Sequence, residues 1–223
     1  SKGRNRLAAA ARGDFLLFLD SDMRPDTPNF LGRWLAEVVE RQPAVVFGGF
    51  SLLQAPTDDR FKVHRAIATR SECLDAAARN HEPEKYVYTS NLLVRRDVFD
   101  TEGFDPAFSG WGWEDVEWAM RVSRRHDVRH IDNPATHMGL DTVESLASKY
   151  RQSAPNFARV VDKHPDIVSA YPSYRMARAL KWVPALGLWR SLILAVVKSG
   201  FVPVAMRAFA LRLYRATLYA DAV

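Results

Sequence analysis

The stretch FLLFLDSDMRPD, residues 15–26, carries the strongest indication of the fold. An uninterrupted apolar run of strand length, Phe15–Leu19, ends in two aspartates separated by one serine, Asp20 and Asp22. The preceding run, residues 4–12, favours a helix that Gly13 ends. Carboxylates at the carboxyl end of a buried strand lie where open α/β sheets bind their ligands. The stretch therefore indicates an α/β fold and a site at the end of the strand.

Helical and extended segments alternate along the rest of the chain. Thr27-Pro28 is typical of a helix start, and a buried helix face is expected to hold Leu31, Trp34, Leu35, Val38 and Val39. Extended segments are predicted at 44–50, 86–94 and 128–131, and helices at 59–79, from Glu114 onward and at 144–163, the last broken or kinked at Pro155. This order predicts a mixed sheet flanked by helices over residues 1–165 and a helical C-terminal extension over 166–223.

Composition and charge narrow the class of protein. The chain has 223 residues, of which 48% are hydrophobic, and its 26% of charged residues mix both signs, which excludes a disordered chain. After Tyr174 eight lysines and arginines are opposed by Asp221 alone. Within this basic segment, residues 182–206 are apolar but interrupted by Arg190, Lys198 and two prolines. We expect them to lie on a membrane surface or to cover the core of the protein.

A single cysteine, Cys73, excludes an intrachain disulfide, and the sequence opens without a secretory leader. Both features favour a cytoplasmic location, with the inner face of the cell membrane as an open alternative. No nucleic-acid partner is expected.

Several interpretations of Asp20-Ser21-Asp22 compete. Carboxylate oxygens suit Mg²⁺ or Mn²⁺, which bridge proteins to nucleotide phosphates. A calcium-binding EF-hand is excluded because Pro25 stands where that loop needs glycine. The run resembles a haloacid-dehalogenase-like phosphatase, but Arg24 stands where that family expects threonine or valine. The structural alternative is a strand end whose polar side chains cap the next turn.

A second motif follows about ninety residues later, in FDPAFSGWGWED, residues 104–115. Glycines beside Trp111 and Trp113 permit close approach of the backbone, and the indole rings offer apolar faces that suit a sugar. Glu114 and Asp115 open a predicted helix, whose dipole favours ionised carboxylates and hence a general base. The alternative is an aromatic core loop followed by an acidic helix start.

Four pieces of sequence together carry a resemblance: GRNRL at 3–7, FLDSD at 18–22, SNLLVRRDVF at 90–99 and GWGWED at 110–115. The chain resembles an inverting nucleotide-sugar glycosyltransferase of GT-A fold and family-2 type over roughly residues 3–140. Its Trp-Gly-x-Glu-Asp element is similar to that of β-1,4-galactosyltransferases and bacterial chondroitin-polymerase modules. The family's opening strands are not in the sequence, and we expect the native protein to carry them before Ser1.

The resemblance implies metal-dependent transfer of a sugar from a nucleotide-sugar donor to a glycan or lipid-linked acceptor, with inversion, in polysaccharide biosynthesis. A UDP-sugar is favoured, with GDP- and dTDP-sugars still open. The implied cofactor is Mn²⁺ or Mg²⁺, with Asp20, Asp22 and His137 as ligands. A non-catalytic glycan-binding or scaffold module of the same fold and a phosphatase remain alternatives.

The resemblance also assigns roles to residues. Asp115 is implied to be the catalytic base, and Glu114 is implied to hydrogen-bond the acceptor or to stabilise that base. Contacts with the donor or the acceptor are expected from a larger set: Arg4, Asn5, Asp20, Asn91, Gly110, Trp111, Gly112, Trp113 and Arg151.

Overall fold

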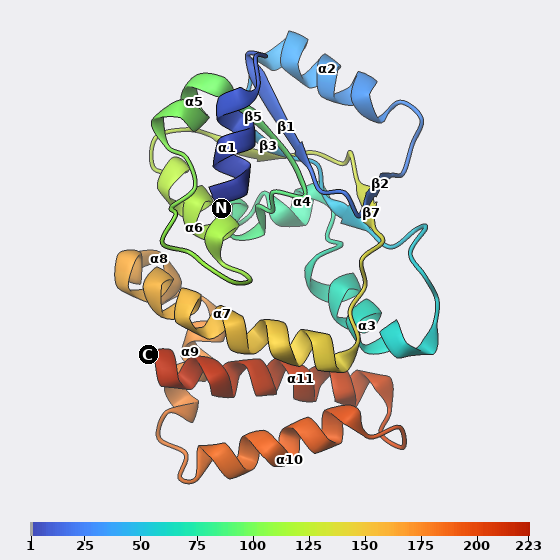
Figure 1. Cartoon of the computed structure of the whole chain (residues 1–223), viewed down its shortest axis with the longest axis vertical. Helices are drawn as coiled ribbons and strands as arrows, with labels where there is room; N and C mark the ends of the chain where they lie inside the picture. The colour runs from blue at the N-terminus through green and yellow to red at the C-terminus, as the bar shows by residue number, and fades with distance from the viewer. Residues whose placement is uncertain (1) are drawn as a thin grey trace. The chain divides into compact units, whose positions relative to one another are not determined.

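The computed structural model describes residues 2–223 and divides into two compact units, each described separately below (Figure 1). The first unit comprises residues up to 56, 68–108 and 114–140, and the second comprises 57–67, 109–113 and 141–223. The expected α/β class with a helical C-terminal region is confirmed. The main part of the second unit begins at Asp141, earlier in the chain than the boundary predicted at 165.

The first unit is built on a four-stranded mixed sheet. Its strand order is β1 (Phe15–Leu19), β5 (Asn91–Arg95), β3 (Val45–Phe47) and β6 (Val128–His130). Strand β5 runs antiparallel to both neighbours, and β3 pairs in parallel with β6. Because successive side chains of a strand point to opposite faces, the apolar run in β1 can pack on both sides of the sheet.

Helices cover both faces of this sheet (Figure 1). One face packs against α1 (Lys2–Ala10), α5 (Arg96–Thr101) and α6 (Glu114–Val122), in a core that includes Phe47 and the fully buried Trp118. The opposite face packs against α2 (Phe30–Arg41), where Phe30 and Trp34 meet Val46 and Leu93. The alternation of Val46 and Phe47 between the two cores is the period-two pattern of a buried strand.

A smaller, three-stranded sheet completes the first unit. Its order is β2 (Met23–Pro25), β7 (Ala135–His137) and β4 (Phe50–Ser51), with β2 antiparallel and β4 parallel to β7. The predicted extended segment at 44–50 is therefore two strands in two sheets, since Gly48 and Gly49 separate β3 from β4.

The helix α2 differs from its prediction. It begins at Phe30 with Asn29 as N-cap, not at Thr27-Pro28. Leu31, Leu35 and Val39 are 67%, 63% and 69% exposed, so the prediction that they share the buried face was wrong. The reason is that the bulky rings of Phe30 and Trp34 fill the contact with the sheet and turn the neighbouring positions outward.

Two other helical segments differ in detail from their predictions. The segment 59–79 is split into η1 (Asp59–Phe61), α3 (Lys62–Ser71) and α4 (Ala76–Arg79). A short helix, η2 (Pro83–Tyr86), ends where the extended segment 86–94 was expected to begin, and β5 forms the later part of that segment. The helix α7 (Val143–Lys163) runs unbroken through Pro155. Proline removes a helical hydrogen bond, but Tyr150 and Phe157 on either side are buried, and their packing offsets that loss.

The second unit is helical. Besides α7 it contains α8 (Pro165–Val168), α9 (Pro172–Leu180), α10 (Leu186–Lys198), α11 (Val204–Tyr219) and η3 (Ala220–Ala222). Its core joins α3, α7, α10 and α11 through residues such as Val63, Tyr150, Val197 and Leu211. Within residues 2–223, no helix combines the length and the apolar character that crossing a bilayer requires.

Candidate active site

The register of β1 and β5 places the ends of two distant segments side by side in the first unit. Leu19 pairs with Asn91, and the Asp20 amide donates to the Ser90 carbonyl at 3.4 Å. Residues that follow β1 therefore lie opposite residues that precede β5. This brings Asp20 into the neighbourhood of Thr89, which the sequence motifs did not single out.

Asp115 is held in the first turn of α6 by Thr89. The amide and the hydroxyl of Thr89 donate to Asp115 Oδ2 at 3.0 and 3.1 Å. The other oxygen, Oδ1, is buried and has no hydrogen-bond partner among residues 2–223. Burial, followed by the negative charge of Glu114, raises the pKa of Asp115 from 3.8 to about 6. A carboxylate with a free oxygen and a raised pKa is suited to accept a proton near neutral pH.

Arg4 lies among three carboxylates. Its Nη2 donates to both oxygens of Asp20 at 3.1 and 3.0 Å, and its Nη1 lies 3.8 Å from Glu114 Oε1. Burial lowers the pKa of Arg4, but the charges of Asp115, Asp20 and Glu114 together outweigh burial and hold that pKa above its ordinary value. Arg4 is thus the charge that allows these acidic groups to share one region.

Asp22 and His137 form a second pair in the first unit. The pairing of Met23 with His137 across β2 and β7 brings His137 Nε2 to 3.3 Å from Asp22 Oδ2. The backbone of Gly139 also comes very close, because a Cβ atom there would lie 2.2 Å from Asp22 Oδ2. Only glycine leaves the carboxylate this position.

This pair fits a divalent cation by its donor chemistry. Carboxylate oxygen and imidazole nitrogen are ligands that Mn²⁺ accepts, and atoms 3.3 Å apart can both bind one ion at about 2.1 Å. Asp20, the third expected ligand, is instead paired with Arg4. Across residues 2–223, no group of three or more His, Cys, Asp or Glu side chains is arranged to hold a metal.

Two asparagines expected to contact the donor have structural partners. Asn5 Nδ2 donates to the Phe104 carbonyl at 2.8 Å, and the Phe104 amide donates back to Asn5 Oδ1 at 3.1 Å. Asn91 is fully buried, and its amide group donates to the carbonyls of Gly49 and Asn133. Both side chains fasten backbone segments of the first unit to one another.

The aromatic motif forms a loop of the second unit, residues 109–113. Gly110, Gly112 and Trp113 have positive φ angles of 74°, 87° and 74°. Such angles suit glycine but cost a tryptophan on the order of 1–3 kcal/mol. Asn156 Nδ2 holds the loop by donating to the carbonyls of Ser109 and Gly112 at 2.9 Å each. Asn156 therefore fixes the backbone conformation of this loop.

The two tryptophans of this loop have different surroundings. Trp111 is 39% exposed, lies 6.0 Å from the Tyr150 ring and has Lys149 Nζ 5.8 Å from its centroid. Trp113 packs 5.0 Å from the Phe157 ring and donates from Nε1 to Tyr219 Oη at 2.9 Å. Trp111 thus keeps an accessible ring face, whereas Trp113 is bound into the helices of its own unit.

Arg151, also expected at the site, lies on α7 of the second unit and donates to Tyr214 Oη at 3.0 Å. The structure therefore brings together Arg4, Asp20, Glu114 and Asp115, and separately Asp22 and His137. Sequence reasoning missed Thr89 and Gly139. The position of Thr89 just before β5, opposite Asp20, could have indicated it once the strand pairing was known.

Residues 1–103, less than half of the chain, match the sequence model described as "Glycosyl transferase family 2". No curated protein matches the chain. The mixed sheet flanked by helices and the match over residues 1–103 agree with the GT-A-like fold that was expected.

The chain is also similar to crystal structures of S. aureus TarS. For TarS 1–349 the identity is 15%, the match covers 99% of this chain and 69% of that chain, and the TM-score is 0.45. For TarS 1–349 in complex with UDP-GlcNAc the identity is 16%, with 99% and 70% covered and a TM-score of 0.41. For a longer TarS chain the identity is 13%, with 99% and 42% covered and a TM-score of 0.47.

The two hydrogen bonds between the Asn5 side chain and the Phe104 backbone can be tested by measuring stability. Asn5→Ala leaves both backbone groups of Phe104 without their partner, so the free energy of unfolding should fall by about 1–3 kcal/mol. Asn5→Asp keeps an acceptor and should lose part of that amount. Urea denaturation measures both variants. An unchanged free energy of unfolding for Asn5→Ala would show that these two hydrogen bonds do not stabilise the fold.

Proposed function

We propose that the chain transfers a sugar from a nucleotide-sugar donor to a hydroxyl group of a glycan or lipid-linked acceptor, with inversion at the anomeric carbon. The observation that carries the proposal is Asp115, whose Oδ1 is buried with no partner in the described part of the chain and whose pKa is raised to about 6. The match of residues 1–103 to glycosyl transferase family 2 supports the same reaction class.

In this reaction Asp115 accepts the proton of the acceptor hydroxyl. The hydroxyl oxygen bonds to the anomeric carbon from the face opposite the nucleotide, and the bond from that carbon to the diphosphate oxygen breaks. The nucleoside diphosphate leaves with the bonding electrons. A single base suffices for such a direct displacement. Thr89 orients the base, since its amide and hydroxyl fix Oδ2 and leave Oδ1 for the incoming proton.

Other residues are assigned to the donor diphosphate and to a metal ion. Arg4 is the residue we assign to the donor diphosphate, because a guanidinium matches the geometry of phosphate oxygens and Arg4 lies beside Asp20 at the end of β1. Asp22 and His137 are the residues that would hold Mn²⁺ or Mg²⁺, which would supply positive charge to the diphosphate. Trp111, which the sequence favoured as a sugar contact, has the exposed ring of the loop in the second unit.

The base assignment is tested by Asp115→Asn. The rate of sugar transfer should fall by about 10²–10⁴-fold, because the amide cannot take a proton. Asp59→Asn is the matched control, since its side chain is 92% exposed, and its rate should equal that of the wild type. Release of nucleoside diphosphate from a panel of sugar nucleotides measures both. Full activity of Asp115→Asn would exclude Asp115 as the base.

The same assay over pH gives a sharper test. A base is active when ionised, and the pKa of Asp115 is raised to about 6. The value of kcat/KM should therefore fall as the pH drops through about 6. Glu114→Gln removes a charge that raises this pKa and should move the limb to lower pH. Arg4→Gln removes a charge that lowers it and should move the limb to higher pH.

The two alternative functions predict different outcomes. Saturable glycan binding without turnover of any sugar nucleotide would favour a non-catalytic module. Release of phosphate from phosphomonoesters that depends on Asp20 would favour a phosphatase.

The metal assignment is tested by Gly139→Ala. The added Cβ would lie 2.2 Å from Asp22 Oδ2, so the carboxylate must leave its present position beside His137. We expect Mn²⁺ affinity, measured by calorimetric titration, to fall by about 10–100-fold. Gly187→Ala is the control, because a Cβ there meets nothing within 4 Å, and it should bind Mn²⁺ as the wild type does. Equal affinities for the two variants would contradict the assignment of Asp22.

A further inference from the structure

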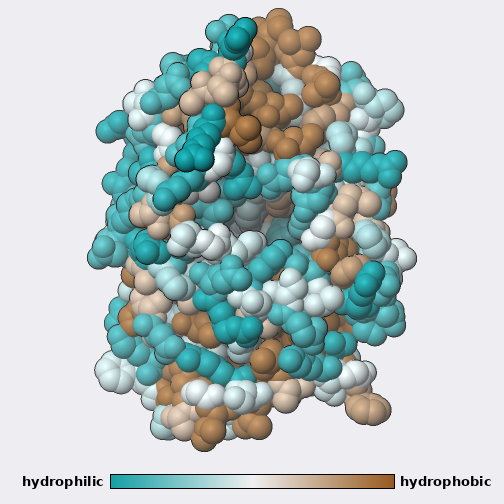
Figure 2. Space-filling model, in the orientation of Figure 1, coloured by the Kyte–Doolittle hydropathy of each residue, from teal (hydrophilic) through white to brown (hydrophobic). Residues whose placement is uncertain are grey.

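The helix α10 carries apolar side chains that its own unit does not cover. Leu188 and Leu192 lie one turn apart and are 70% and 59% exposed, and Trp189 beside them is also exposed. Two more aromatic residues are exposed just beyond the ends of α10, Trp182 before it and Phe201 after it. Figure 2 shows hydrophobic surface over this helix. So many exposed apolar side chains on one helix are unusual for a surface that contacts only water.

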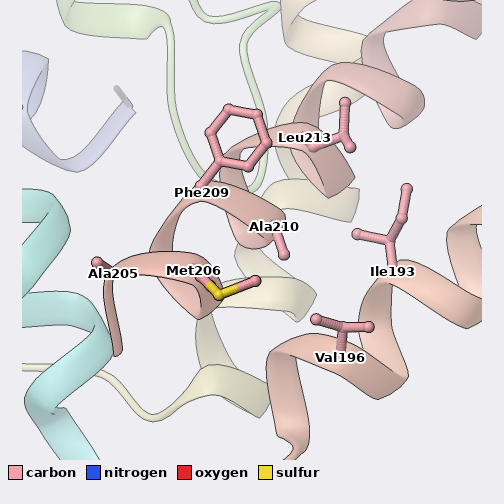
Figure 3. A pocket seen from close by; sticks show the side chains of 7 residues that line it. All are labelled: Ile193, Val196, Ala205, Met206, Phe209, Ala210 and Leu213. Atoms are coloured by element: carbon pink, nitrogen blue, oxygen red, sulfur yellow. The ribbon is translucent and has the colours of Figure 1, made fainter. Parts of the chain in front are cut away.

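The helix α11 extends this apolar surface. Between α10 and α11 lies an open groove of about 440 Å³ whose lining side chains are all apolar (Figure 3). Ile193 and Val196 contribute from α10, and Met206 and Phe209 from α11. The exposed face of α10 and the groove together form what we call the α10–α11 face.

The part of the chain that forms the α10–α11 face is rich in positive charge. From Arg175 to the last residue the chain has eight lysines and arginines and one acidic residue, Asp221. The Asp221 carboxylate is paired with Arg190, whose Nη2 lies 2.7 Å from its Oδ2. Several of the cations are exposed on α9, α10 and the segment between them: Arg175, Arg178, Lys181 and Lys198. The second unit therefore combines this apolar face with exposed cations on α9, on α10 and on the segment between them.

We propose that the α10–α11 face binds the surface of an anionic lipid bilayer, with α10 lying in the interface. The 13 residues of α10 span about 20 Å, too short for a hydrocarbon core of about 30 Å. Exposed tryptophan is typical of the level of the lipid headgroups, and lysine and arginine attract anionic headgroups. This proposal does not depend on the proposed sugar transfer.

A second copy of the chain is the less favourable occupant. A two-fold contact through the same face would set the cations of one copy against those of the other, with only Asp221 to offset them. An anionic bilayer meets both requirements of the surface, since its headgroups bind the cations and its acyl region takes the apolar side chains.

Co-sedimentation of the chain with vesicles tests the proposal. We expect binding to vesicles of phosphatidylcholine and phosphatidylglycerol to be about tenfold stronger than to phosphatidylcholine alone, and to weaken as salt is added. Leu188→Ser/Leu192→Ser should lower the partition coefficient by about tenfold or more. Arg175→Gln/Arg178→Gln should reduce the preference for phosphatidylglycerol and leave binding to phosphatidylcholine unchanged.

The helix α2 offers a matched control. Leu31 and Leu35 have the same spacing as Leu188 and Leu192 and are exposed to a similar degree. Leu31→Ser/Leu35→Ser should bind vesicles as the wild type does. Circular dichroism checks that both variants keep their helices, as expected for exposed positions.

Three outcomes would overturn the proposal. The first is wild-type chain that stays in the supernatant with phosphatidylglycerol vesicles, which needs no variant. The second is equal vesicle binding by the α10 variant and the α2 control. The third is a concentration-dependent dimer in sedimentation equilibrium that the α10 substitutions abolish, in place of vesicle binding.

Discussion

The candidate active site depends on one cation, the guanidinium of Arg4. Asp20, Glu114 and Asp115 would repel one another if gathered without it, and the buried Asp115 would become still harder to ionise. Arg4 binds Asp20 through two hydrogen bonds and lies near Glu114, so it balances charges from two segments about ninety residues apart. Arg4 also lowers the pKa of Asp115, which burial and Glu114 raise to about 6.

The surroundings of Asp115 lower the free energy of unfolding at neutral pH. A carboxyl group whose folded pKa is raised from 3.8 to about 6 binds its proton more tightly in the folded state, so its contribution to stability declines as pH rises through that window. The unpartnered Oδ1 adds a desolvation cost. The fold sustains these costs because Trp118, three residues along α6, is fully buried against Phe99 and Phe104.

Two elements that carry candidate site residues agree with local signals in the sequence. The apolar run ending in Asp20 and the acidic start of α6 are local signals, and the structure has a strand and a helix there. The pairing of Asp22 with His137 agreed with an expectation from the family resemblance. Contacts that depend on tertiary packing could not be predicted from the sequence. The side chains of Asn5 and Asn91 bind backbone groups. Leu31 and Leu35 are exposed because Trp34 fills the contact with the core.

Asp115 is proposed to be the base of the reaction, with a carboxyl group that loses its proton near pH 6. Titration of the Asp115 side-chain carboxyl by carbon-13 NMR, with its signal assigned by its loss in Asp115→Asn, tests this in the absence of any substrate. We expect a midpoint near pH 6, as burial and Glu114 require. A midpoint near the ordinary value of 3.8 would contradict the claim, because the carboxylate would then be a solvated or fully paired group with no poised proton acceptor.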